Sequence, residues 1–208
     1  MEAIQYNLLP KLILNKPVRK YSLEEFLKKE EQSKYKHNYI NGQILKVPMA
    51  RGPHNIISAN IIVELTIKAE EKGKEIVIYS SDQMVYFPSL NEGVYADSLA
   101  VSDKPLYWDD NKLLLINPKL VVEVLSKSTQ KYDRSGKRNA ARYDKYKTLE
   151  SFKEYVLIHQ DECYAEVRFQ FKPGYWQETI IRDLDGKLPL QSLGIEVDLK
   201  RIYKNIEF

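Results

Sequence analysis

The chain has 208 residues, of which 43% are hydrophobic and 29% are charged, a balance typical of globular domains that excludes disordered and collagen-like chains. Its length favours one compact domain, and its net charge of +3 does not by itself indicate a nucleic-acid-binding protein. A single cysteine, Cys163, excludes an internal disulfide and a cysteine-rich zinc module. Because the sequence also lacks a bilayer-length apolar run and a secretion signal, we expect a cytoplasmic protein without a membrane segment.

The N-terminal residues differ in pattern from the rest of the chain. Residues 1–20 show no sustained periodicity, so we expect them to form an arm, followed by a single domain over 21–208. A helix is predicted to begin after Ser22, because Ser22 and Glu25 have the spacing of a capping box. We expect this helix to end near Ser33.

A hairpin and a long helix are predicted next. Asn41-Gly42 lies between apolar residues, and this dipeptide is typical of a tight turn that joins two antiparallel strands. Residues 53–72 carry apolar side chains at helical spacing, with Pro53 in the first turn and Gly73 beyond the end. We expect this helix to lie against a sheet.

The remainder of the chain alternates strands with one more helix. Residues 120–125 form an almost continuous β-branched run, as expected of a strand that is buried on both faces. A polar loop is predicted over 102–117 and a helix over 133–146. Further strands are predicted at 75–79, 83–87, 94–101, 154–159, 164–171 and 176–182. This order predicts a mixed α/β or α+β domain.

Glu123 is the most informative residue, because it interrupts the apolar strand at 120–125. Burying a carboxylate is costly unless it is paired, protonated or bound to a cation. Glu123 could therefore pair with a nearby lysine or arginine, reach solvent at the end of the strand, or bind a metal ion. The strand alone does not decide between these interpretations.

Asp97 is a second acid in a strand-like segment, 26 residues before Glu123. Alone it is an ordinary polar strand position. Two acids on adjacent strands, however, can share a divalent metal, and Mg²⁺ is typically held by one or two carboxylates together with water and phosphate. The pair of acids is therefore more informative than either residue.

Basic residues follow Glu123 closely. The segment 127–147 contains eight lysines or arginines against Asp133 and Asp144, a net charge of 8 − 2 = +6. Lys137 lies 14 residues after Glu123, and the first turn of a helix that returns after a strand lies near the carboxyl end of that strand. Cations beside paired acids suit a phosphodiester substrate. The alternative is a solvated basic helix face.

Other catalytic motifs are missing from the sequence. His37, His54 and His159 show no metal-ligand spacing, and His54, just inside a helix start, fits a hydrogen-bonding or capping role better than a ligand. A P-loop, a dinucleotide-binding fingerprint and a serine-esterase motif are absent. Nucleotide hydrolysis, dinucleotide binding and esterase chemistry therefore have no support.

Short motifs through nearly the whole chain occur in an order that resembles one protein family. They are Tyr21-Ser22-Leu23-Glu24-Glu25-Phe26, Tyr39-Ile40-Asn41-Gly42-Gln43, His54-Asn55, Ser81-Asp82-Gln83, Tyr95-Ala96-Asp97, the run from Leu120 to Thr129, Tyr132 to Lys137, Glu154 to Ile158, and the tail from Leu193 to Phe208 as a closing strand and terminal helix. Together they resemble the Uma-two family of restriction endonucleases, within the PD-(D/E)XK nuclease superfamily.

This resemblance implies a restriction endonuclease-like fold, in which a central mixed β-sheet is flanked by helices, and a divalent-metal nuclease site. Asp97 and Glu123 would be the two metal-binding acids, and the backbone carbonyl of Val124 a further ligand. A lysine displaced onto the following helix takes the catalytic role in this family, and Lys137 matches that residue.

The sequence departs from the family pattern at several positions. The superfamily's usual lysine position, two residues after the acid, is Leu125, and Ala96 replaces a proline before Asp97. Gln43 stands where the family usually has a glutamate, which removes a third acid. The helix after Lys137 is about five residues longer than the family pattern, so Arg142 competes for the place of the lysine.

The first functional hypothesis is a Mg²⁺- or Mn²⁺-dependent endonuclease that acts on DNA as a homodimer. Asp97 and Glu123 would hold the metal, Lys137 would position or activate the water, and Ser126 and Ser128 would assist contacts to the substrate or at the helix start. The residues expected to bind the DNA backbone are Lys131, Arg134 and Arg138. The alternatives are a catalytically inactive nucleic-acid- or protein-binding module on the same fold, and a structural homodimer whose buried acids only pair with lysines.

Overall fold

The computed structural model describes residues 19–126 and 137–208, so only the last two residues of the expected N-terminal arm are included. The described helices are α1 (Leu23–Gln32), α2 (Gly52–Glu71), α4 (Lys137–Tyr146) and α5 (Leu199–Ile202), together with the 3-10 turn η1 (Trp108–Asp110). Within these residues, every helix is too short or too polar to span a lipid bilayer.

A six-stranded mixed sheet forms the centre of the fold, in the order β11-β10-β9-β8-β6-β3. Its strands are β3 (Val77–Tyr79), β6 (Ser98–Val101), β8 (Leu120–Leu125), β9 (Glu154–His159), β10 (Ala165–Lys172) and β11 (Tyr175–Ile181). β8 and β9 pair in parallel, whereas the other neighbours are antiparallel. Every residue of β8 is buried, which confirms the buried strand predicted from its β-branched run.

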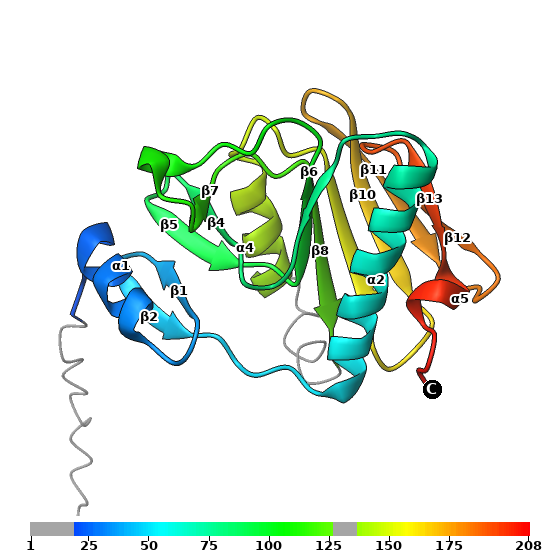
Figure 1. The fold of residues 1–208 in the computed structure, drawn as a ribbon, viewed down its shortest axis with the longest axis horizontal. Helices are drawn as coiled ribbons and strands as arrows, with labels where there is room; N and C mark the ends of the chain where they lie inside the picture. The colour runs from blue at the N-terminus through cyan, green and yellow to red at the C-terminus, as the bar shows by residue number, and fades with distance from the viewer. Residues whose placement is uncertain (1–18, 127–136) are drawn as a thin grey trace, which may run out of the picture.

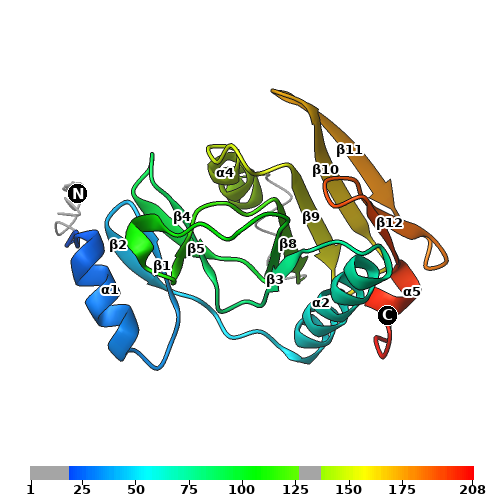
Figure 2. The same ribbon diagram turned by 45° about the horizontal axis from the view of Figure 1, so that its top comes forward.

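Helices α2 and α4 cover opposite faces of this sheet (Figure 2). Successive side chains of a strand point to opposite faces, and β8 accordingly contributes to two hydrophobic cores. Val122 and Val124 pack in one core with Ile61 of α2. Val121 packs in the other with Tyr146 of α4. The sheet therefore holds the two helices at fixed positions around β8, and the long helix predicted over 53–72 lies against it as expected.

A five-stranded sheet carries α1 at one end of the molecule (Figure 1), in the order β2-β1-β5-β4-β7. Its strands are β1 (His37–Ile40), β2 (Gln43–Lys46), β4 (Met84–Phe87), β5 (Glu92–Tyr95) and β7 (Leu114–Leu115). The hairpin predicted at Asn41-Gly42 is confirmed, with both residues at positive φ. The predicted capping box is confirmed too, because Ser22 and Glu25 exchange hydrogen bonds of 2.8 and 3.1 Å.

The prediction of a single strand over 94–101 is wrong. The chain forms β5 up to Tyr95 and β6 from Ser98, and these two strands belong to different sheets. Ala96 and Asp97 form the link between them. The segment is apolar on both sides of the link and contains no internal glycine or proline, so its local pattern does not reveal the change of sheet. Asp97 therefore precedes β6 and does not lie within a strand.

Two other predicted regions need correction. The loop expected over 102–117 contains η1 and the two-residue strand β7, which is too short for a periodic pattern. The C-terminal region contains an unpredicted strand, β12 (Lys187–Leu190), which pairs with β13 (Ile195–Asp198). The terminal helix expected within the tail is the single turn α5 after β13. The two unpredicted strands, β7 and β12, form by pairing with other strands and have no clear local pattern of their own.

Candidate metal-binding acids beside β6 and β8

Asp97 is fixed against β8 by a backbone hydrogen bond. The next residue, Ser98, pairs with Val122 across β6 and β8, so this register carries Asp97 toward Glu123. Asp97 Oδ2 accepts the backbone N–H of Val124 at 2.7 Å. Since β6 begins only at Ser98, the carboxylate of Asp97 takes the place of a backbone acceptor from β6. It satisfies the N–H of Val124 and so continues the hydrogen bonding between β6 and β8.

His54 provides a second contact to the same oxygen of Asp97. It is the third residue of α2, and its Nε2 lies 3.2 Å from Asp97 Oδ2. Burial disfavours the imidazolium, but the hydrogen bond and the charge of Asp97 outweigh burial and raise the pKa of His54. This contact agrees with the hydrogen-bonding role expected for His54. Both contacts use Oδ2, and among the described residues Asp97 Oδ1 accepts no hydrogen bond.

Glu123 is buried on the α4 side of β8. Its Oε2 accepts a hydrogen bond from Arg142 Nη1 at 2.7 Å, and the hydroxyl of Tyr146 lies 3.4 Å from Oε1. Burial raises the pKa of Glu123 to about 7; Arg142 opposes this effect, while the charge of Asp97 adds to it. The ion-pair interpretation of Glu123 thus has its partner in the structure, and this partner is an arginine.

Arg142 joins two parts of the fold. Besides Glu123, it contacts the carbonyl oxygen of Tyr95, which accepts a hydrogen bond from Nη2 at 2.7 Å. Arg142 and Tyr146 are four residues apart on α4, a spacing that places two side chains on the same face of a helix. The sequence pattern indicates Arg142 only as a competitor of Lys137 and does not indicate Tyr146. The i,i+4 spacing was the available signal, but nothing local identified Glu123 as the partner.

The predicted cations are described only in part. Lys137 begins α4, but the side chains of Lys137 and Arg138 lie outside what the structure describes, as do all atoms of Lys131 and Arg134. Ser126 directly follows β8, and Gln43 is half-buried at the start of β2. The structure thus brings together Asp97, Glu123, Val124 and His54, and the predicted roles of the cations stay predictions.

The donors around Asp97 and Glu123 fit a Mg²⁺-type ion. Both side chains are carboxylates, and the N–H and C=O of one strand residue point to the same side, so the carbonyl of Val124 faces the side of Asp97. Mg²⁺ uses oxygen ligands and keeps several waters, so two carboxylates and a carbonyl suffice. Among the described residues, no group of three or more His, Cys, Asp or Glu side chains is arranged to hold a metal ion, so backbone and water would have to complete the shell.

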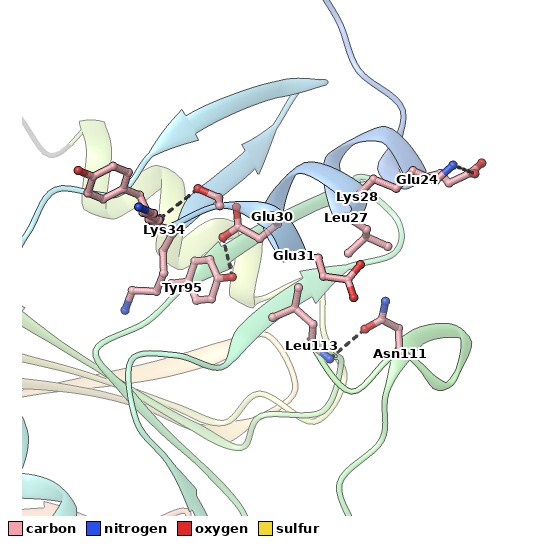
Figure 3. Close-up of a pocket in the computed structure, with 12 residues that line it drawn as sticks. Glu24, Leu27, Lys28, Glu30, Glu31, Lys34, Tyr95, Asn111 and Leu113 are labelled. Carbon is pink, nitrogen blue, oxygen red and sulfur yellow. Dashed lines mark hydrogen bonds and ion pairs between the residues drawn. The ribbon is translucent and has the colours of Figure 1, made fainter.

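A pocket of about 540 Å³ lies beside α1, with Tyr95, Asn111 and Leu113 on its wall. Figure 3 shows the hydrogen bond that links its residues Tyr95 and Glu30, and the donor–acceptor distance is 2.9 Å. Asp97 and Glu123 do not line this pocket. Tyr95 nevertheless contacts both regions, because its hydroxyl faces the pocket while its carbonyl binds Arg142.

Comparisons with known proteins identify sequence relatives and a solved structure of similar fold. Two relatives come from Synechocystis. The protein sll1609 is 29% identical over 146 residues, which are 70% of this chain and 78% of that protein. The protein slr1290 is 27% identical over 192 residues, which are 92% of this chain and 96% of that protein. A crystal structure from Anabaena variabilis, described as "a putative nuclease belonging to DUF820", has a TM-score of 0.64 at 17% identity and covers 88% of this chain and 97% of its own.

The structural likeness confirms the expected mixed α+β, restriction endonuclease-like fold. The sequence profile of the Uma2 family, described as "Putative restriction endonuclease", matches residues 23–200, which is most of the chain and includes both acids. The chain belongs to the Uma2 family.

Proposed function

We propose that this protein is a divalent-metal-dependent endonuclease that hydrolyses phosphodiester bonds of DNA. The observation that carries the proposal is the placement of two carboxylates where β6 begins beside β8: Asp97 is hydrogen-bonded to the residue that follows Glu123, and the charge of Asp97 raises the pKa of Glu123. We propose Asp97, Glu123 and the carbonyl of Val124 as ligands for Mg²⁺ or Mn²⁺. The bound ion would polarise the scissile phosphate and lower the pKa of a bound water.

The surrounding residues have separate roles in this proposal. The Val124 N–H and His54 hold Asp97 Oδ2, which leaves Oδ1 for the ion. Lys137, at the start of α4, would hold the attacking water or a phosphate oxygen. Lysine can do this as a compact charge and can lose its proton beside a metal, whereas arginine stays protonated. The DNA backbone would lie along the basic segment, contacting Lys131, Arg134 and Arg138, with Ser126 beside them.

The family supports a nuclease function in general terms, since its profile and the Anabaena variabilis protein are both described by that activity. DNA as the substrate and Mg²⁺ or Mn²⁺ as the cofactor are part of this proposal. So are a homodimeric state and a cytoplasmic location, which we carry forward as expectations from the sequence.

A second candidate function is a catalytically inactive binding module on the same fold. The contact that favours it is the ion pair of Arg142 with Glu123, because a guanidinium at 2.7 Å occupies one oxygen of a proposed metal ligand. Gln43, which stands where the family usually has a glutamate, also favours this alternative because it removes a third acid. In this alternative the basic segment still binds nucleic acid, but the acids have only a structural role.

Calorimetric titration with Mn²⁺ and Mg²⁺ separates the two functions. The wild-type protein is expected to bind the ion, and Asp97→Asn, alone or combined with Glu123→Gln, is expected to abolish binding. Asparagine keeps an acceptor for the Val124 N–H, so the fold is preserved. Equal binding by wild type and the double variant would show that the acids are not the metal site.

A further inference from the structure

Arg142 is held at the acid pair by two acceptors of different kinds. Nη1 donates to the carboxylate of Glu123 and Nη2 to the backbone carbonyl of Tyr95, both at 2.7 Å. The carboxylate can accept another cation, whereas the carbonyl is part of the fixed backbone at the end of β5. Arg142 can therefore remain beside the site through Tyr95 when Glu123 takes another partner.

The guanidinium and a divalent ion make opposing demands on Glu123. The carboxylate is almost fully buried, with 6% of its side chain exposed, so water screens the charges around it only weakly. Arg142 neutralises Glu123 while no metal is bound. When an ion binds the same carboxylate, the fixed positive charge of Arg142 repels it and its hydrogen bond must lengthen or break.

We infer that Arg142 acts as a built-in competitor of the divalent ion for Glu123, which keeps the metal affinity of the site low. This inference rests on the proposed function, because it assigns a regulatory role within the same site. It makes Arg142 a positioning residue: it holds Glu123 in place without metal and yields part of that contact when metal binds. The affinity of the site is then set by an arginine that the two acids do not require for coordination.

Two substitutions separate charge from shape. Arg142→Gln keeps an amide that can donate to Glu123 or to the Tyr95 carbonyl, but it removes the positive charge. Arg142→Lys keeps the charge and loses the two-pronged geometry. Arg201→Gln is the matched control, because Arg201 Nε donates to the buried Glu64 at 2.8 Å on α2, away from the acid pair.

The experiment is calorimetric titration of Mn²⁺ into wild type and the variants at one ionic strength and at several pH values above 7, with circular dichroism to confirm folding. The pH is varied because Arg142 lowers the pKa of Glu123, so its removal favours the protonated carboxyl, which does not bind metal. Removing one unit charge beside a weakly screened ion is expected to tighten binding by about tenfold or more in Arg142→Gln. Arg142→Lys is expected to stay near the wild-type affinity, and Arg201→Gln to match wild type. Adding Asp97→Asn to Arg142→Gln should remove the gain, which assigns it to this site.

The outcomes distinguish this inference from the proposed function. If wild type binds Mn²⁺ through Asp97 but Arg142→Gln binds equally or more weakly, the competitor role is overturned while the metal site stands. If neither wild type nor Arg142→Gln binds Mn²⁺, both proposals are overturned. Binding by Arg142→Gln together with undetectable binding by wild type would support the competitor role most strongly.

Discussion

Asp97 Oδ2 accepts the backbone N–H of Val124 at 2.7 Å, so a side chain from the link between β5 and β6 continues the hydrogen bonding of β6 against β8. Through this contact, one residue serves the sheet and lies at the proposed metal site. Its structural and chemical roles can be separated by substitution.

We predict that Asp97→Ala lowers the free energy of unfolding by roughly 1–3 kcal/mol, the usual cost of leaving a buried donor without a partner. Asp97→Asn keeps an acceptor and should cost less. Urea unfolding of the two variants and wild type measures the difference. Equal stability of Asp97→Ala and Asp97→Asn would show that this hydrogen bond does not stabilise the sheet.

Glu154 should make the protein less stable as pH rises. Its buried carboxylate accepts hydrogen bonds from the backbone of Gln191 and from Ser192, but burial dominates and raises its pKa from 4.5 to about 7. Between these two pH values the folded state holds more protons than the unfolded state, so this contribution favours folding at low pH and is lost as pH rises to 7.

Glu154→Gln cannot titrate and should flatten this pH dependence by about 3 kcal/mol, at about 1.4 kcal/mol per pKa unit. Urea unfolding of wild type and Glu154→Gln at pH 4.5 and pH 8 gives the loss of stability between these pH values for each protein. These losses are compared rather than the absolute stabilities, because glutamine has one hydrogen-bond acceptor fewer than glutamate. Glu123 contributes in the same direction, since its pKa is also about 7, so part of the slope should remain. An unchanged slope in Glu154→Gln would contradict the assignment.

Lys137→Ala is predicted to abolish metal-dependent cleavage while Mn²⁺ affinity and the circular dichroism spectrum stay close to wild type. The residue begins α4 and is proposed to act on the water or phosphate rather than on the ion. Lys137→Arg keeps the charge but cannot act as a base. It should therefore bind DNA as wild type does without restoring full cleavage. Lys200→Ala, an exposed lysine of α5, is the control, and cleavage by Lys137→Ala at the rate of this control would exclude Lys137.

The basic segment is predicted to dominate contact with DNA. Reversing the charges of Lys131, Arg134 and Arg138 to glutamate should weaken binding and reduce its salt dependence. The slope of log binding constant against log salt concentration should become shallower by roughly 0.9 for each phosphate that the protein no longer neutralises. Binding is measured without divalent metal, over a range of salt concentrations.

The control makes the same change of charge outside the basic segment, at the exposed Lys187, Lys200 and Lys204. Its affinity should exceed that of the first triple variant at every salt concentration. If both triple variants lose affinity equally, net charge rather than the basic segment governs binding.

The sequence was sufficient to predict the buried strand that carries Glu123 and a long helix that lies against a sheet. A β-branched run predicts burial on both faces, and apolar residues at helical spacing over 53–72 predict packing against a sheet, because both signals are local. The acid in the buried strand was informative for the same reason: burial makes a charge costly wherever it lies along the chain.

The change of sheet at Asp97 and the partner of Glu123 could not be predicted in this way. Residues 94–101 have a continuous strand pattern, and the break arises because β5 and β6 find partners in different sheets. Arg142 meets Glu123 because α4 packs across β8, a distance of 19 residues along the chain. Both relationships depend on tertiary packing, which spacing within the sequence does not encode.

The most direct test of the central claim is cleavage of DNA by the purified protein with Mg²⁺ or Mn²⁺, compared with the same reaction in excess chelator and with Asp97→Asn. We predict that wild type cleaves DNA only in the presence of the ion and that Asp97→Asn abolishes this cleavage. Failure of wild type to cleave single- or double-stranded DNA with either ion, with Gln43→Glu equally inactive, would contradict it and favour the binding module.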